Sequence, residues 1–115
     1  MPTIRTTRHR NYRGPVTDTD IWDVFALRPD DIIVDTPPKC GTTWMLNIVM
    51  MLIFGRAVPD AGSRDNAPWL DCAFADRPAR AAFLDSLERR RCIKSHTPMD
   101  GIPYGPDPTY IVVFR

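Results

Sequence analysis

A run of small, hydroxylated and basic residues lies between two apolar stretches of the chain. It reads Thr36-Pro37-Pro38-Lys39-Cys40-Gly41-Thr42-Thr43-Trp44. If the second apolar stretch forms a helix, its first N–H groups have no partner within the helix and lie at the positive end of the helix dipole. Phosphate and similar anions bind readily at such a position. The run is therefore a candidate anion site, with Lys39 as a nearby positive charge and the hydroxyls of Thr42 and Thr43 as donors.

The same residues also have a structural interpretation. Thr42 or Thr43 can cap the helix, Lys39 can be an exposed charge, and Trp44 can belong to the core. Trp44 can equally offer a flat aromatic face to a stacked base. The lysine stands before Gly41, so the run lacks the GxxxxGK[ST] pattern of nucleotide-binding phosphate loops, and a small kinase is disfavoured.

A second candidate group is His96, which follows Lys94 and Ser95 at the end of another apolar stretch. The ordinary pKa of a histidine lies near neutrality, which suits a general base. A single histidine after a strand is more often a structural group. The residues around His96 leave both interpretations open.

Short apolar stretches predict the strands that would position these groups. They cover residues 32–34, 92–95 and 109–114, and the first and the third are apolar on both faces. Helical periodicity predicts one helix over residues 42–54, ending at Gly55, and a second helix that begins after Asp76. Strands separated by helices predict an α/β fold with a parallel sheet and right-handed crossovers. Residues 56–72 and 99–108 then form connections.

The apolar pattern also predicts which helix faces are buried. Apolar side chains continue almost all round the helix at 42–54, so we expect it to be packed on most sides. The inner face of the second helix is expected at four positions: Ala79, Ala82, Phe83 and Leu87. A shorter helical segment is expected within residues 18–27.

The composition is that of one soluble globular domain. The chain has 115 residues, of which 43% are apolar and 25% charged, and its net charge is +1. This balance argues against a general attraction to nucleic acid or membrane. The apolar run at 48–54 is much shorter than the roughly 20 residues of a membrane span. Three cysteines without a CxxC pair predict neither a metal site nor disulfides and favour a cytoplasmic location. Residues 1–16 are expected to be a polar, basic, solvated tail.

Three segments together resemble the cytosolic sulfotransferase family, whose sulfuryl donor is 3′-phosphoadenosine 5′-phosphosulfate (PAPS). Residues 35–44 resemble the loop that binds the 5′-phosphosulfate. Residues 91–98, Arg-Cys-Ile-Lys-Ser-His-Thr-Pro, resemble a later family segment with a lysine and a histidine. Residues 110–115 resemble the strand that ends in an arginine for the 3′-phosphate. These matches have the family's order and spacing and cover residues 28–115.

The resemblance implies a fold like that of P-loop nucleotide-binding proteins and transfer of a sulfuryl group to the hydroxyl or amine of a small acceptor, without metal. It implies that His96 is the base and that Lys39 and Lys94 stabilise charge on the leaving phosphate oxygen. The implied donor-binding residues are Lys39, Cys40, Gly41, Thr42, Thr43, Trp44 and Arg115. Trp69 and Phe74 would line the acceptor pocket, because residues 68–71 resemble the family's acceptor-side segment.

Residues 17–115 are expected to be the N-terminal part of a larger domain. A strand that is apolar on both faces needs helices on both sides of the sheet, and only two substantial helices are predicted. The family's later serine and its glycine-rich loop, which complete the nucleotide site, do not occur in these 115 residues. We therefore expect impaired turnover, and a non-catalytic nucleotide-binding fragment or gene remnant is the alternative.

Overall fold

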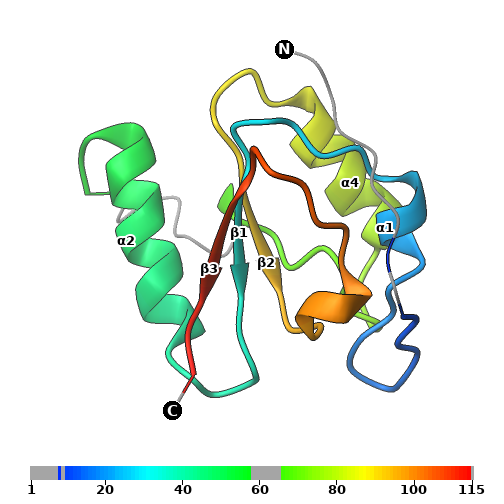
Figure 1. Ribbon diagram of the computed structural model, residues 1–115. Helices are drawn as coiled ribbons and strands as arrows, with labels where there is room; N and C mark the ends of the chain where they lie inside the picture. Colours follow the sequence, from blue (N-terminus) through cyan, green and yellow to red (C-terminus); the bar gives the residue numbers. More distant parts are fainter. Residues whose placement is uncertain (1–7, 9, 58–65, 115) are drawn as a thin grey trace.

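A parallel sheet of three strands lies at the centre of the computed structural model, which describes residues 8, 10–57 and 66–114 (Figure 1). The strands are β1 (Ile32–Asp35), β2 (Cys92–Ser95) and β3 (Thr109–Val112), in the order β2-β1-β3. Both neighbours pair with β1 in parallel, and Asp35 lies opposite Ser95 and Val112. The carboxyl ends of the strands therefore meet at one edge of the sheet, where open α/β sheets place their binding crevices.

Helices cover both faces of the sheet around β1 and β2. One face carries α2 (Thr42–Phe54), and the other carries α1 (Ile21–Val24) and α4 (Arg77–Ser86), as Figure 1 shows. The side chains of successive β1 residues point to opposite faces of the sheet. Val34 packs with Leu46 of α2, whereas Ile33 packs with Leu84 of α4. The α/β fold with a parallel sheet that the sequence predicted is confirmed.

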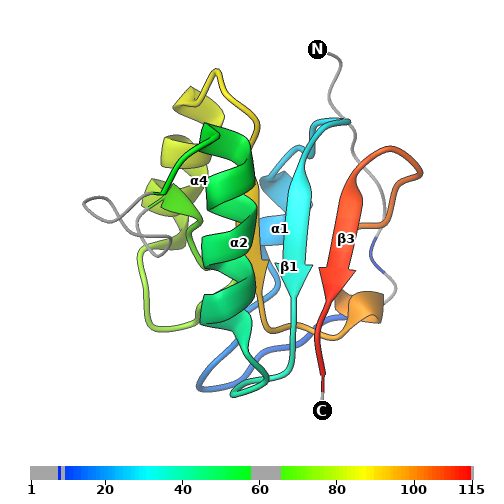
Figure 2. The same ribbon diagram turned by 90° about the vertical axis from the view of Figure 1, so that its left-hand side faces the viewer.

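The edge strand β3 differs from its prediction. It ends at Val112, and its residues are half-buried or exposed, so it is not the strand buried on both faces that its apolar residues suggested. Figure 2 shows α2 in front of β2, with β1 and β3 beside the helix. Because α2 covers that side of the sheet only partly, Val112 and Phe114 keep exposures of 46% and 75%.

The ends of α2 are set by two glycines. Gly41 is the N-terminal cap with a φ of 91°, and no side chain caps the helix there, so the expected threonine cap is wrong. Gly55 ends the helix with a φ of 69°, as predicted. Left-handed φ values of this kind are readily adopted only by glycine.

Only one side of α2 is buried, so the expectation of a helix packed on most sides is wrong. Leu46, Val49 and Met50 face the sheet, while Leu52 on the opposite side is 77% exposed. The apolar residues surround the helix, and the sequence therefore could not indicate which side would meet the sheet.

The helix α4 begins after Asp76, whose side chain accepts a hydrogen bond from the Ala79 N–H at 3.0 Å, as predicted for a cap. Its buried residue is Leu84, and Ala79, Ala82 and Phe83, three of the four expected inner residues, are exposed. The helix is thus rotated about its axis relative to the prediction, and Arg77 and Arg80 explain this rotation. Their guanidinium groups donate to the carbonyl oxygens of Ala73 and Trp69, which turns the arginine side of the helix inward.

In the described part of the N-terminal segment, residues 10, 11 and 13–16 are exposed, whereas Arg8 and Tyr12 are tied to the fold, so the expectation of a solvated tail is wrong for Arg8. Its side chain is only 4% exposed and donates to the carboxylate of Asp23 at 2.7 Å. Farther along, the Tyr12 hydroxyl donates to Asp100 Oδ1 at 2.7 Å. Asp100 belongs to η1 (Met99–Gly101), a short helix that follows His96 closely in the chain.

A substitution at Gly101 is expected to destabilise the protein. An added Cβ would lie 2.4 Å from Thr97 Cγ2 and 2.6 Å from Tyr12 Cδ2, and Thr97 is itself held by a hydrogen bond to Asp71. We expect Gly101→Ala to lower the free energy of unfolding by about 1–3 kcal/mol, as overpacking does. Gly14→Ala is the matched control, because nothing lies within 4 Å of its Cβ position. Equal denaturation midpoints for the two variants would contradict the prediction.

No helix among residues 8, 10–57 and 66–114 combines the length and the apolar character needed to cross a membrane.

Candidate functional site

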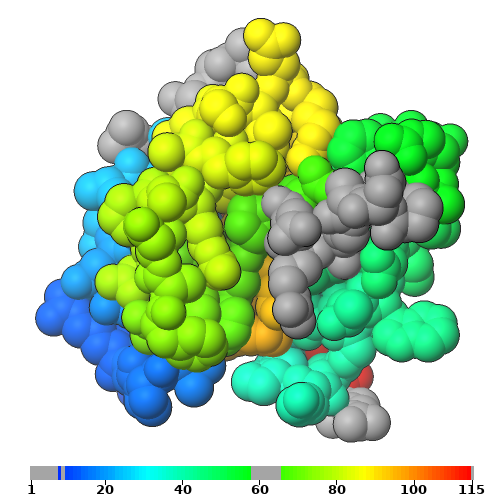
Figure 3. Space-filling model, turned by 180° about the vertical axis from the view of Figure 1, so that it is seen from behind, coloured from blue at the N-terminus to red at the C-terminus, as the bar shows by residue number. Residues whose placement is uncertain are grey.

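A cavity of about 510 Å³ opens where the strands end and α2 begins. Its walls are formed by Val16, Pro38, Lys39, Gly41, Thr42, Thr43, Trp44, Trp69, Lys94 and His96. Figure 3 shows the hollow between the two helical sides of the molecule, with part of β2 visible at its floor. The structure therefore brings most of the residues predicted from the sequence to one cavity.

Two of the predicted site residues that the structure describes are not on this cavity. Cys40 is half-buried and does not belong to the wall. Phe74 lines an adjoining cavity. Arg115, predicted for the 3′-phosphate, lies outside the described residues.

The turn before α2 has the backbone of an anion cradle. Lys39 has a φ of 65°, a value uncommon for a residue with a side chain, and Gly41 has a φ of 91°. Turns with left-handed residues bring successive N–H groups into a concave arrangement that binds anions. The positive end of the α2 dipole lies at the cavity wall formed by Gly41 and Thr42, and the cap residue, Gly41, has no side chain to occupy the N–H groups there.

The two threonines of the turn have different surroundings. Thr42 is buried, and its hydroxyl is in close contact with the hydroxyl of Thr36. Thr43 is exposed and also lines the cavity. The hydroxyl of Thr43 is therefore the one available to an anion, while Thr42 ties the turn to the end of β1.

The ring of His96 is oriented by a hydrogen bond from one of its nitrogens to the backbone. Its Nδ1 lies 2.7 Å from the carbonyl oxygen of Thr36, so Nδ1 carries the proton and donates it. Nε2 then has a free electron pair, as a base requires. Burial is the main cause that lowers the pKa of His96, and the Lys94 charge adds to it; the Thr36 carbonyl and Asp71 act in the opposite direction. The lowered pKa favours the neutral form of the ring at pH 7.

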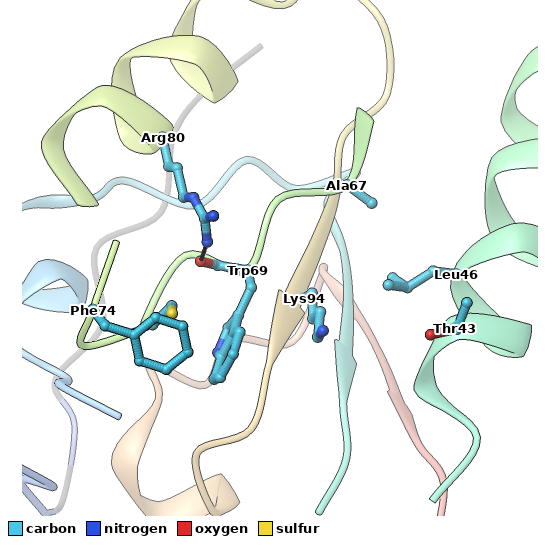
Figure 4. Close-up of a pocket in the computed structure, with 8 residues that line it drawn as sticks. Thr43, Leu46, Ala67, Trp69, Phe74, Arg80 and Lys94 are labelled. Carbon is cyan, nitrogen blue, oxygen red and sulfur yellow. Dashed lines mark hydrogen bonds between the residues drawn. The ribbon is translucent and has the colours of Figure 1, made fainter. Parts of the chain in front are cut away.

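Trp69 connects this cavity with a second one of about 410 Å³. Residues 68–70 run beside β2, with hydrogen bonds from the Leu70 N–H to the Lys94 carbonyl and from the Lys94 N–H to the Pro68 carbonyl. Figure 4 shows the Trp69 ring between Phe74 and Lys94, with Leu46 and Thr43 of α2 across the second cavity. Its lining combines apolar side chains of Leu46, Ala67, Trp69, Cys72 and Phe74 with the polar or charged Thr43, Arg80 and Lys94. Thr43, Trp69 and Lys94 also line the first cavity.

Comparisons with known proteins decide the family. A family profile described as "Sulfotransferase domain" matches residues 29–115. The chain belongs to the sulfotransferase family. The chain is also similar to a glycolipid sulfotransferase of Mycobacterium tuberculosis, with 39% identity over 105 residues that cover 90% of this chain and 32% of that protein.

Two vertebrate sulfotransferases are more distantly similar. Cytosolic sulfotransferase 1 of Danio rerio is 33% identical over 74% of this chain and 31% of its own length. Human sulfotransferase 1E1 is 31% identical over 80% of this chain and 32% of its own length. The chain thus spans about a third of the length of these relatives.

In this sulfotransferase chain, Asp71 is a buried residue beside the site that was not among the predicted site residues. It is fully buried, although an aspartate is an exposed residue by default. Its position directly after Pro68-Trp69-Leu70 was the available signal. A second buried carboxylate, Asp35, has its pKa raised to about 7, first by burial and then by the charge of Asp71.

Proposed function

We propose that this chain takes part in sulfuryl transfer from PAPS to the hydroxyl or amine of a small acceptor. The observation that carries the proposal is that the anion cradle and His96 line one cavity. A group held at the cradle and an acceptor near His96 would then be neighbours. Positioning of this kind, together with charge stabilisation, supplies most of the catalysis in the related transfer of phosphoryl groups.

The residues at the cradle fit the 5′ end of the donor. The bound donor would supply the sulfuryl group and leave as the nucleotide 3′,5′-bisphosphate. Lys39, the N–H groups at the start of α2 and the Thr43 hydroxyl would hold the negative oxygens. Trp44 is 79% exposed at the cavity rim, where its ring can stack on adenine. The resemblance assigns the 3′-phosphate to Arg115.

His96 and Lys94 would perform the proton and charge steps. The free Nε2 of His96 would take the proton of the acceptor hydroxyl as the new bond forms. Lys94 has its Nζ 4.9 Å from the centre of the Trp69 ring and lines both cavities. Together with Lys39 it would stabilise negative charge on the departing phosphate oxygen.

The second cavity suits the acceptor. Leu46, Ala67, Trp69 and Phe74 give it an apolar part beside the polar Thr43, Arg80 and Lys94, which favours an acceptor with an aromatic or aliphatic part beside its hydroxyl. The named activity of the mycobacterial relative makes a glycolipid one acceptor to test. The relative named a cytosolic sulfotransferase supports a cytoplasmic location.

A transfer assay with labelled PAPS tests the proposal. We expect a labelled product with one or more members of a panel of phenols, alcohols, amines and glycolipids. Binding of 3′-phosphoadenosine 5′-phosphate, measured by quenching of tryptophan fluorescence, is expected alongside it. Nucleotide binding without transfer would instead favour a non-catalytic binding protein, and the absence of both would overturn the proposal.

A further inference from the structure

Asp71 is a fully buried carboxylate whose hydrogen bonds join separate segments around the site. Its Oδ1 accepts a bond from Trp69 Nε1 at 2.7 Å. Its Oδ2 accepts three more, from the Ser95 hydroxyl at 2.6 Å, the Thr97 hydroxyl at 2.7 Å and Trp22 Nε1 at 2.9 Å. Hydrogen bonds to an ionised acceptor are shorter and stronger than neutral ones. Four such bonds allow a charge to remain in a buried place and hold its partners firmly.

Two of the donors stand on either side of His96 in the chain. Ser95 precedes it and Thr97 follows it, and both are buried. The Thr97 N–H also donates to the Ser95 hydroxyl at 3.1 Å. Asp71 therefore holds both chain neighbours of His96. Since His96 Nδ1 is bonded to the Thr36 carbonyl, the ring itself has one defined orientation.

A third donor, Trp69, contacts the site groups directly. Its ring meets the His96 ring edge to face, with 4.7 Å between the ring centres and an interplanar angle of 82°. On the same ring, the Lys94 Nζ lies 4.9 Å from the centre. An indole has one hydrogen-bond donor, so the bond to Asp71 fixes the rotation of the ring that both groups touch.

We propose that Asp71 is a positioning residue for the transfer reaction, which holds Trp69 and the chain around His96 so that His96 and Lys94 keep their places at the cavity. This proposal rests on the proposed function. Asp71 acts through other residues, because it is not on the wall of either cavity. A displacement of a reacting group by about 1 Å can cost about a hundredfold in rate, so the effect on catalysis is expected to be large.

Asp71→Asn is the direct test. The asparagine has nearly the same shape but only one acceptor oxygen. If this oxygen faces the three donors at the Oδ2 position, the NH₂ group meets the Trp69 N–H, and that bond is lost. We expect kcat to fall about a hundredfold. The affinity for 3′-phosphoadenosine 5′-phosphate should stay nearly unchanged, because the cradle residues do not contact Asp71.

Asp31→Asn is the matched control. Asp31 is equally buried and accepts a hydrogen bond from Arg91 Nε at 2.7 Å, but it lies just before β1, at the other end of that strand from the site. This variant should lose stability and keep its kcat. Trp69→Phe is a second test in case Asp71→Asn does not fold. It removes the bond to Asp71 Oδ1 and keeps a smaller aromatic ring on the wall of both cavities, while the other three donors of Asp71 remain. This variant is also expected to lower kcat.

NMR titration of His96 gives a readout that needs no turnover. The chain has two histidines, so His9→Gln assigns the signals. The Asp71 charge raises the pKa of His96 against the larger lowering by burial, so Asp71→Asn should lower this pKa further. Unchanged kcat and unchanged His96 signals in folded Asp71→Asn and Trp69→Phe would overturn the positioning role. Shifted signals in a protein whose wild type transfers no sulfuryl group would show that Asp71 orders the surroundings of His96, but would overturn the proposed function and with it a role in transfer.

Discussion

Replacing His96 by asparagine is expected to lower kcat by about 10²–10⁴, the usual contribution of a general base. Asparagine can still donate to the Thr36 carbonyl, which His96 Nδ1 contacts at 2.7 Å, but it has no basic nitrogen. The nucleotide site would remain, because its groups come from the turn before α2. We therefore expect a wild-type Kd for 3′-phosphoadenosine 5′-phosphate together with the loss of kcat. A variant with near-normal kcat would exclude His96 as the base.

The pH dependence of the wild-type protein checks the same role. The base must be neutral, and burial lowers the pKa of His96 below the ordinary value of about 6.5. The rate should therefore be constant around pH 7 and fall only at lower pH, by about tenfold per pH unit below that pKa. His96→Asn should lose this acidic limb from its residual activity. An acidic limb that persists unchanged in the variant would assign it to another group.

Replacing Lys39 by methionine is expected to weaken both binding and catalysis. Methionine keeps an unbranched side chain but removes the charge from the cradle. Loss of one charged donor should raise the Kd of the nucleotide about 10–100-fold, and loss of charge stabilisation should lower kcat about 10²–10³-fold. Calorimetric titration and single-turnover transfer separate the two effects.

Arg56→Met is the matched control for Lys39→Met. Arg56 is an exposed cation just beyond the other end of α2, where it donates to the Ala57 carbonyl. The substitution removes the same charge far from the cavity, so the Kd and kcat should stay at wild-type values. Equal losses in the two variants would mean that the overall charge of the protein, and not the cradle, attracts the nucleotide.

Local signals in the sequence were sufficient for the elements that carry the site. β-branched residues bounded by turn residues predicted β1, and the aspartate before a helical pattern predicted the cap of α4 at Asp76. The cradle was predictable because it is one continuous segment, from Lys39 to Trp44. Lys94 and His96 were predictable for the same reason, and the structure places them on the same cavity as the cradle.

Features that depend on distant partners were not predictable. The inner side of α4 is set by Arg80, whose guanidinium reaches the Trp69 carbonyl, and no local pattern records that contact. The side of α2 that meets the sheet is set by the sheet, because the apolar residues of this helix surround it. The role of Asp71 depends on four donors that lie close together only after folding.

The central position of β1 has a consequence for how the chain folds. Ile32 of β1 pairs with Cys92 of β2 on one side and with Thr109 of β3 on the other. Among these three strands β1 is synthesised first, and both of its partners are synthesised at least 57 residues later. During synthesis both edges of β1 stay without these partners until nearly the whole described chain has been made. Sheets whose strands pair over such long sequence distances form slowly. The entropy cost of closing the long loops comes before the strand contacts that offset it. The nascent chain therefore carries two open strand edges, the usual starting points of aggregation, until β2 and β3 have been made.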